Sequence, residues 1–206
     1  VMKFVSQILA LFPIADSCYD RLVERTEEAL QGGVTFVQLR MKDEEGKAFF
    51  EMAVQMKALC DQYQIPLVIN DRVDIALAVD AAGVHLGQTD LPVEVVRKIL
   101  GPEKIIGITG RTKEDFERAA KAGADYGGAG AFVFTGTKAD CLLMTLEEFE
   151  ELCSQSPIPL VGIGGITTET SGKILSAGAA GVSVCSAILG APDIQKAASK
   201  FLSEKL

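Results

Sequence analysis

Short apolar segments alternate with amphipathic segments along the whole chain. Eight apolar segments occur, at residues 8–14, 35–39, 66–69, 83–86, 104–108, 125–129, 159–163 and 181–184. Continuous apolar runs without strict alternation are typical of parallel strands that are buried on both faces. The pattern therefore predicts eight buried parallel strands.

The segments between these runs carry apolar residues at helical spacing. They include residues 20–31, 44–63, 113–122, 145–153, 168–177 and 192–206. Shorter helices are expected to begin near Val73 and after Pro92. Alternation of strands and helices favours parallel βαβ units, and eight of them in 206 residues fit a compact (β/α)8 TIM barrel. We predict one domain over residues 1–206, with an open doubly wound sheet as the structural alternative.

Composition narrows the class of protein. Hydrophobic residues make up 48% of the chain and charged residues 23%, which excludes a disordered chain. The net charge is −8 and no Lys/Arg cluster interrupts it, so no nucleic-acid partner is expected. No apolar run approaches the roughly 20 residues that cross a bilayer, so no membrane partner is expected either. The sequence makes no prediction of the oligomeric state.

Cysteine and histidine usage indicates a compartment and excludes some chemistry. The five cysteines are scattered, with no pair at the spacing of a zinc or redox site. Reduced thiols and the lack of a secretory pattern at the start of the chain predict a cytoplasmic protein. His85 is the only histidine, which excludes His-rich metal sites, and inside a strand it is expected to be a hydrogen-bonded core residue.

Polar residues follow the apolar runs, where a barrel of this kind places its active site. Gln38, Arg40 and Lys42 share one face of an extended segment, because side chains alternate with a period of two. Arg40 and Lys42 can then face one phosphate, the first as a bidentate fork and the second as a point charge. A solvated strand end is the alternative.

Two carboxylates follow neighbouring runs. Asp71 comes after the third run and Asp90 after the fourth. Mg2+ prefers oxygen ligands and often takes one or two carboxylates, so this pair is a candidate magnesium site. The alternative is that each aspartate caps the helix that follows it.

The later runs end in hydroxyl and glycine residues. Thr109 ends the fifth run, and Thr112 is a suitable cap for the following helix. The loop after the sixth run offers Thr135, Thr137 and Lys138 without P-loop spacing, and a surface loop without a ligand is the alternative. The last two runs lead into Gly164-Gly165 and Cys185-Ser186. Loops after strands 7 and 8 often bind phosphate in TIM barrels, with a tight turn as the alternative.

Taken together, these segments resemble thiamine phosphate synthases (thiamin-phosphate pyrophosphorylases). The matching stretches are VQLRMK at 37–42, INDRVDIALAVD at 69–80, GVHLGQTDLP at 83–92, IGITGRT at 106–112, TGTK at 135–138, PLVGIGGIT at 159–167 and SVCSAIL at 183–189. They occur in the family's order and cover nearly the whole chain.

The resemblance implies a TIM-barrel transferase that uses Mg2+ and two small-molecule substrates. Such enzymes join hydroxymethylpyrimidine diphosphate to a thiazole phosphate and release pyrophosphate. The diphosphate is thought to leave first, which gives a pyrimidine-methyl cation that the thiazole nitrogen captures. The protein must then stabilise a departing polyanion and hold the nucleophile in place.

The motif match assigns roles residue by residue. It implies that the diphosphate is bound by Arg40, Lys42, Asn70, Thr109 and Lys138. It implies that Mg2+ is held by Asp71 and Asp90, and that Gln38 positions the pyrimidine. Thiazole phosphate would be held by Thr135, Thr137, Gly165, Cys185 and Ser186. Leu39, Met41 and Gly136 lie within the matched substrate-binding stretches.

The chain departs from the family pattern at several of these positions. Thr109 stands where serine is usual, Arg111 where histidine is usual, and Met41 where glutamate is usual. Two prolines of the loop after the sixth run are replaced by Ala131 and Phe134. Loss of proline enlarges the unfolded ensemble and loosens a loop, so thiazole positioning is the function most exposed to this change.

Two other functions are compatible with the same scaffold. A related thiazole tautomerase lacks the metal and diphosphate residues and relies on a histidine, whereas this chain has Asn70, Asp71, Asp90 and Lys138. A noncatalytic protein that binds thiamine precursors is the second alternative. The altered loop after the sixth run favours it, and the retained cations and carboxylates oppose it.

Overall fold

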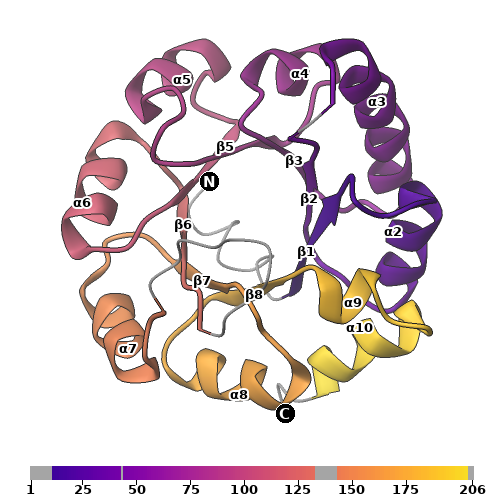
Figure 1. Ribbon diagram of the computed structural model, residues 1–206. Coiled ribbons are helices and arrows are strands. Elements are labelled where there is room, and N and C mark those ends of the chain that lie inside the picture. The colour runs from indigo at the N-terminus through magenta and orange to yellow at the C-terminus, as the bar shows by residue number, and fades with distance from the viewer. Residues whose placement is uncertain (1–10, 43, 133–142, 204–206) are drawn as a thin grey trace.

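The structure of the chain is a computed structural model, which describes residues 11–42, 44–132 and 143–203. Eight parallel strands close into a barrel in sequence order, and helices surround it (Figure 1). The strands are β1 (Leu11–Asp16), β2 (Val37–Arg40), β3 (Leu67–Asn70), β4 (Gly83–Leu86), β5 (Ile105–Thr109), β6 (Tyr126–Ala129), β7 (Leu160–Ile163) and β8 (Gly181–Val184). The predicted TIM barrel is confirmed, and the open doubly wound sheet is wrong.

The helices lie on the outside of the barrel: α2 to α8 each connect two consecutive strands, and α9 and α10 follow the last strand. They are α2 (Leu22–Gln31), α3 (Gly46–Gln62), α4 (Val73–Ala78), α5 (Val93–Leu100), α6 (Lys113–Ala122), α7 (Leu146–Gln155), α8 (Thr168–Ser176), α9 (Ser186–Leu189) and α10 (Ile194–Ser203). The sequence predicts β4, β8 and α6 with the observed bounds, whereas the four-residue helix α9 is not predicted. The predicted cap of α6 is confirmed, because Thr112 and Asp115 form a reciprocal capping box.

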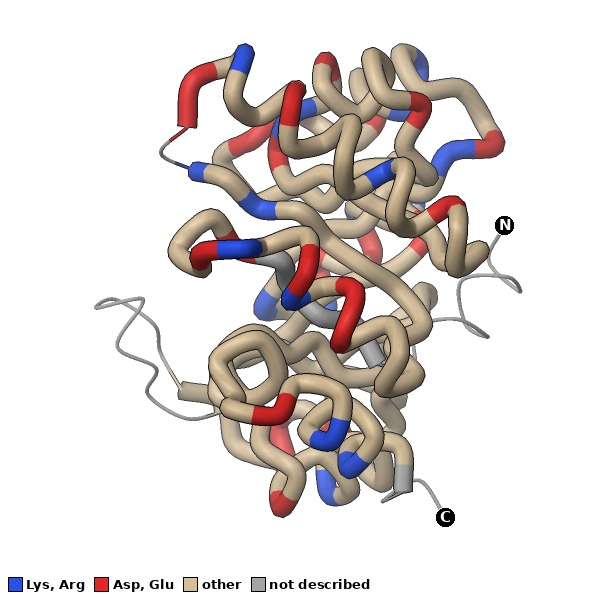
Figure 2. The backbone as a smooth tube through the Cα atoms, turned by 90° about the vertical axis from the view of Figure 1, so that its right-hand side faces the viewer, with Lys and Arg blue, Asp and Glu red and all other residues tan. Residues whose placement is uncertain are grey.

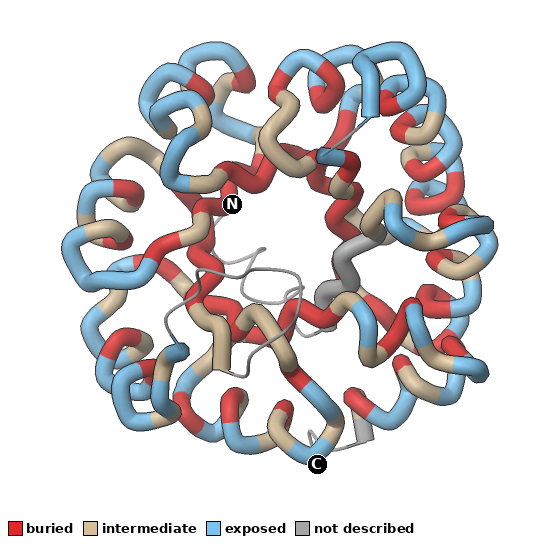
Figure 3. The backbone as a smooth tube through the Cα atoms, in the orientation of Figure 1, coloured by how far each residue is buried: buried red, intermediate tan, exposed pale blue. Residues whose placement is uncertain are grey.

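Apolar side chains form two separate cores. The larger one lies between the strands and the helices, which present buried inner faces and exposed outer faces (Figure 3). The smaller one fills the barrel itself, with Phe36, Val68, Ile105, Tyr126 and Val161. The barrel is therefore a packed interior, which leaves its two ends as the places where a ligand can bind.

A single glycine makes room for the largest of the interior side chains. Tyr126 is fully buried, and a Cβ atom on Gly107 of the neighbouring strand would lie 2.1 Å from its ring. The ring thus occupies the volume that a side chain at residue 107 would need. Any substitution of Gly107 would displace Tyr126 from the barrel interior.

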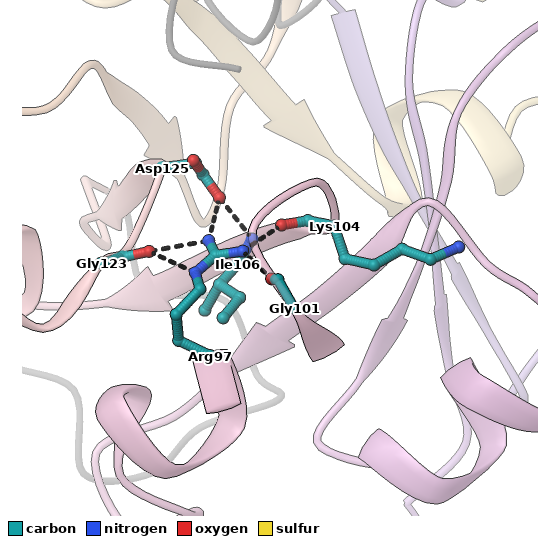
Figure 4. A network of polar contacts seen from close by, with 6 residues as sticks. All are labelled: Arg97, Gly101, Lys104, Ile106, Gly123 and Asp125. Atoms are coloured by element: carbon teal, nitrogen blue, oxygen red, sulfur yellow. Dashed lines mark hydrogen bonds and ion pairs between the residues drawn. The ribbon is translucent and has the colours of Figure 1, made fainter. Parts of the chain in front are cut away.

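An arginine links the segments that precede β5 and β6 at the N-terminal end of the barrel (Figure 4). Arg97 of α5 donates to the carbonyls of Gly101, Lys104 and Gly123 and pairs with Asp125 at 2.6 Å. The same Asp125 oxygen also accepts the backbone N–H of Ile106 at 2.8 Å. The five donor contacts of Arg97 match the five N–H groups of a guanidinium, so this network is closed within the protein.

Charged residues are spread over the outer surface. On the side that Figure 2 presents, Lys and Arg are interspersed with Asp and Glu. No concentrated basic face is visible on that side. None of the described helices combines the length and the apolar character that a membrane crossing requires.

Candidate functional site

Several of the predicted site residues lie at the C-terminal end of the barrel. Arg40, Asn70 and Thr109 are the last residues of β2, β3 and β5. The strands β2 to β5 are consecutive neighbours in the barrel, so their ends lie side by side. Asp71 directly follows β3, and its backbone N–H donates to the carbonyl of His85 on β4 at 2.9 Å.

Asp71 lies in a cluster of like and unlike charges. Burial, followed by a side-chain hydrogen bond with Asp90 and the charge of Asp90, raises the pKa of the Asp71 carboxyl to about 6. Lys42 and Arg40 act in the opposite direction on the same pKa. Two carboxylates and two cations that follow or end three neighbouring strands therefore act on one another at one place.

Neither aspartate caps a helix. The N-cap of α4 is Arg72 and that of α5 is Pro92, and neither makes a side-chain cap hydrogen bond. Asp90 instead accepts the backbone N–H of Gly87 with Oδ2 at 2.6 Å. Asp71 has a left-handed backbone conformation with φ of 62°, which is uncommon outside glycine and clusters at functional sites. The capping alternative is wrong at both positions.

Asp16, which the sequence prediction did not include, lies beside Arg40. It is the last residue of β1, in register with Arg40 on β2, and its Oδ2 accepts a hydrogen bond from Nη1 of Arg40. Its Oδ1 accepts the backbone N–H of Cys18 at 3.1 Å. The predicted first strand ended at Ile14, whereas the observed strand reaches residue 16. With the strand end placed correctly, the rule that polar residues at strand ends form the site would have identified Asp16 as a candidate.

A buried hydrogen-bonded chain crosses the barrel interior beneath this cluster. Nδ1 of His85 lies 2.9 Å from the hydroxyl of Tyr126, and Nε2 lies 3.0 Å from Oγ1 of Thr109. His85 is therefore a hydrogen-bonded core residue, as predicted. Burial, and secondarily the charge of Asp125, raises the pKa of Tyr126 well above its ordinary value, so its hydroxyl keeps its proton.

The β2 residues divide between the two faces of the sheet. Gln38 is buried, and its Oε1 has no hydrogen-bond partner among the described residues. A buried acceptor without a partner is costly unless a ligand or water satisfies it. Leu39 and Met41 pack instead into the core under the helices. Only their main-chain atoms are thus available to a ligand in the barrel mouth.

The second phosphate-binding candidate lies at the ends of β7 and β8. Gly165 follows β7 with φ of 68° and precedes α8, and Cys185 is the N-cap of the short helix α9, which begins at Ser186. Burial first, and then the charge of Asp16, raises the pKa of the Cys185 thiol to about 12. The thiol is therefore neutral at physiological pH.

Several predictions fall outside the described residues. These are Thr135, Gly136, Thr137 and Lys138, together with the substituted Phe134. Within the described part of the chain, no group of three or more His, Cys, Asp and Glu side chains could hold a metal ion. Any metal at this end of the barrel would thus take ligands beyond the two aspartates, which is the usual arrangement for Mg2+ with water and phosphate.

Comparison with known proteins identifies relatives over almost all of the described chain. The model of the thiamine monophosphate synthase family matches residues 11–188. A thiamine-phosphate synthase of Alkaliphilus oremlandii is 48% identical over 179 residues, which are 87% of this chain and 86% of the relative. A thiamine-phosphate synthase 2 of Streptococcus pneumoniae is 42% identical over 90% of this chain and 88% of the relative.

Solved structures give the same result. The thiamine phosphate pyrophosphorylase of Pyrococcus furiosus is similar with a TM-score of 0.89 and 36% identity, covering 97% of this chain and 96% of the other. A 3-hexulose-6-phosphate synthase has a TM-score of 0.69 at 14% identity, covering 94% of this chain and 98% of the other. This second likeness reflects the barrel fold alone.

Proposed function

Because the chain belongs to the thiamine monophosphate synthase family, we propose that it joins hydroxymethylpyrimidine diphosphate to a thiazole phosphate and releases pyrophosphate. The observation that carries this proposal is the convergence of Arg40, Lys42, Asp71 and Asp90 at one end of the barrel. A departing diphosphate carries several negative charges, and cations placed beside it stabilise it more in the transition state than in the ground state.

The donor set at Asp71 and Asp90 fits Mg2+. Burial first, and then the hydrogen bond and charge of Asp90, raises the pKa of Asp71, and a divalent cation held by the two carboxylates would offset their mutual repulsion. Both ligands are hard oxygen atoms, and the nearby Arg40 and Lys42 mark where a polyphosphate would complete the coordination. When bound there, Mg2+ would supply charge stabilisation to the leaving pyrophosphate.

The side chains of the barrel mouth have separable tasks in this reaction. Arg40 offers a planar fork of N–H donors and Lys42 a flexible point charge, and both would bind the diphosphate. Asn70 would donate its amide N–H groups to the same anion. His85 fixes the position of the Thr109 hydroxyl, which would donate a further hydrogen bond. These groups lower the barrier by holding a charged leaving group that water would otherwise solvate.

The two substrates also have to be held in line. The Oε1 atom of buried Gln38, which has no partner among the residues that the structure describes, would accept a hydrogen bond from the pyrimidine amino group. Main-chain N–H groups near Gly165 and Ser186 would bind the thiazole phosphate, together with Cys185. Fixing both reactants in one cavity converts the encounter of two molecules into a step within one complex.

The decisive experiment combines purified protein with both substrates, first with Mg2+ and then with a chelator. The proposal expects pyrophosphate and thiamine phosphate in equal amounts, and the loss of both when the metal is removed. Binding of the substrates without product would favour a noncatalytic protein. Conversion of the thiazole phosphate alone would favour the tautomerase. Either of these two outcomes contradicts the proposal.

A further inference from the structure

Asp16 makes an interaction that none of the assigned roles uses. One of its oxygens accepts the backbone N–H of Cys18, two residues further along the chain, at 3.1 Å. The other accepts Nη1 of Arg40 from the adjacent strand. Both oxygens therefore have partners, and one of these partners is the main chain of the turn that follows β1.

This ion pair differs from the exposed pairs on the outer helices. The side chains of Asp16 and Arg40 are 17% and 28% exposed, whereas those of the Lys47–Glu51 pair on α3 are 88% and 60% exposed. Exposed pairs contribute little because water and salt screen them and because both side chains lose freedom. A partly buried pair in which the carboxylate is already fixed to the main chain can instead fix the arginine.

Asp16 lies between the two parts of the candidate site. Strand β1 pairs with β2 on one side and with β8 on the other, so Asp16 at the end of β1 stands between Arg40 at the end of β2 and Cys185, which follows β8. An arginine side chain has several rotatable bonds, so a free guanidinium at this place would sample many orientations. Its contact with Asp16 restricts these orientations before any substrate arrives.

We propose that Asp16 is a positioning residue for the diphosphate site: its carboxylate holds Nη1 of Arg40, so that the other N–H donors of the guanidinium are oriented toward the diphosphate. The proposal rests on the proposed function of Arg40 as a diphosphate ligand. It assigns Asp16 no contact with the substrate, because its two oxygens are occupied by Cys18 and Arg40.

Charge and orientation make opposite predictions for the removal of this carboxylate. Asp16 is an anion close to a site for a polyanion, so on charge alone its neutralisation would strengthen anion binding. If Asp16 acts by orienting Arg40, neutralisation weakens binding, because the guanidinium loses its preorganisation. The sign of the change therefore distinguishes the two effects.

The test measures the affinity for inorganic pyrophosphate in the presence of Mg2+ by titration calorimetry. Asp16→Asn keeps an oxygen for the N–H of Cys18 but removes the charge, and we expect binding about tenfold weaker, the size of one charge-assisted hydrogen bond. Asp16→Glu keeps the charge and displaces it by one methylene, and binding should also weaken. Tighter or unchanged binding in Asp16→Asn would overturn the proposal.

A matched control is available in the same connection. Asp20 pairs with Arg25 at 2.9 Å, and its side chain is 78% exposed. Asp20→Asn removes an equal charge from the β1–α2 segment without touching Arg40. Pyrophosphate affinity should stay within about twofold of that of the wild type, as expected for an exposed pair.

A double-mutant cycle separates positioning from a general effect on the fold. In the background of Arg40→Ala, Asp16→Asn should change the pyrophosphate affinity by less than about twofold, because its effect passes through Arg40. A full tenfold loss in that background would contradict the proposal. Wild-type protein that makes product but does not bind pyrophosphate would overturn it as well. Wild-type protein that binds pyrophosphate without making product would refute the proposed function and leave the cycle to decide on Asp16.

Discussion

Charged side chains are arranged differently at the two ends of the barrel. At the N-terminal end, Arg97 is surrounded by carbonyls and by Asp125, and its five donor contacts close the network (Figure 4). At the C-terminal end, Asp71 and Asp90 lie side by side, and the pKa of Asp71 is raised. The first arrangement stabilises the chain itself. The second places two carboxyl groups in contact, which is unfavourable when both are ionised and favourable for binding a cation.

The largest expected effect is on the stability of the protein and follows from substitution of Arg97 at the N-terminal end of the barrel. Arg97→Ala leaves Asp125 buried without its partner and four carbonyl contacts unmade, so we expect a loss of about 3–5 kcal/mol in the free energy of unfolding. Urea denaturation measures this directly. The matched control is Arg118→Ala, which removes a pair to Asp115 whose arginine is 69% exposed and should cost less than about 1 kcal/mol. An Arg97 variant that keeps its stability but loses activity would reverse the comparison.

The next largest effect is on activity and follows from substitution of Asp71 at the C-terminal end of the barrel. Asp71→Asn removes a proposed metal ligand, and we expect kcat/KM for product formation to fall about 100-fold. Its melting temperature in metal-free buffer should not fall, because the neutral amide relieves repulsion with Asp90. Asp74→Asn is the control: Asp74 pairs with Arg72 at 2.6 Å and is 64% exposed, and this variant should keep wild-type activity. Equal activity of the Asp71 and Asp74 variants would remove the functional half of the comparison.

A smaller effect, on both stability and activity, is expected from substitution of Tyr126 in the barrel interior. Tyr126→Phe keeps the ring in the space that Gly107 leaves and removes the hydroxyl that contacts His85. We expect a loss of about 1–1.5 kcal/mol in stability and a decrease in kcat of about threefold, because Thr109 is held less firmly. Tyr63→Phe, which removes a hydroxyl bound to Glu27 at 3.1 Å on the outside of the barrel, should leave kcat unchanged. A similar decrease in both variants would exclude a role for the interior chain.

The smallest expected effect is on activity and concerns Thr112. It tests whether a polar residue at the C-terminal end of the barrel takes part in function merely because it lies there. Thr112 caps α6 through a capping box with Asp115 and lies just after Thr109. Thr112→Ala should cost about 1 kcal/mol in stability, as the loss of a helix cap does. Its kcat/KM should remain within about twofold of the wild-type value. A large loss of activity would show that the cap also positions the mouth of the barrel.

The sequence predicted the strands because their signals are local. β4 and β8 each begin with a glycine and consist of four buried residues, and their predicted bounds agree with the structure. Helix α9 was missed because four residues are too few to show helical periodicity. The end of β1 was missed because the prediction ended the strand at Ile14, whereas parallel pairing with β2 extends it to Asp16.

The sequence predicted which residues of the candidate site lie at the end of each strand, but not which residues of neighbouring strands they contact. Arg40, Asn70, Thr109, Asp71 and Asp90 each follow an apolar run, and closure of the barrel brings these ends together. The partners of these residues depend on neighbouring strands and were not predicted. Asp16 meets Arg40 through the β1–β2 register, and Tyr126 reaches His85 only because Gly107 on the strand between them has no side chain.

The most direct test of the difference between the two ends is to locate a metal at the C-terminal end of the barrel. Crystals grown with Mn2+ in place of Mg2+ and with inorganic pyrophosphate would reveal the cation by its anomalous scattering. The account predicts one strong peak within coordination distance of carboxylate oxygens of both Asp71 and Asp90, with pyrophosphate beside Arg40 and Lys42. A peak elsewhere, or pyrophosphate bound away from these four side chains, would contradict it.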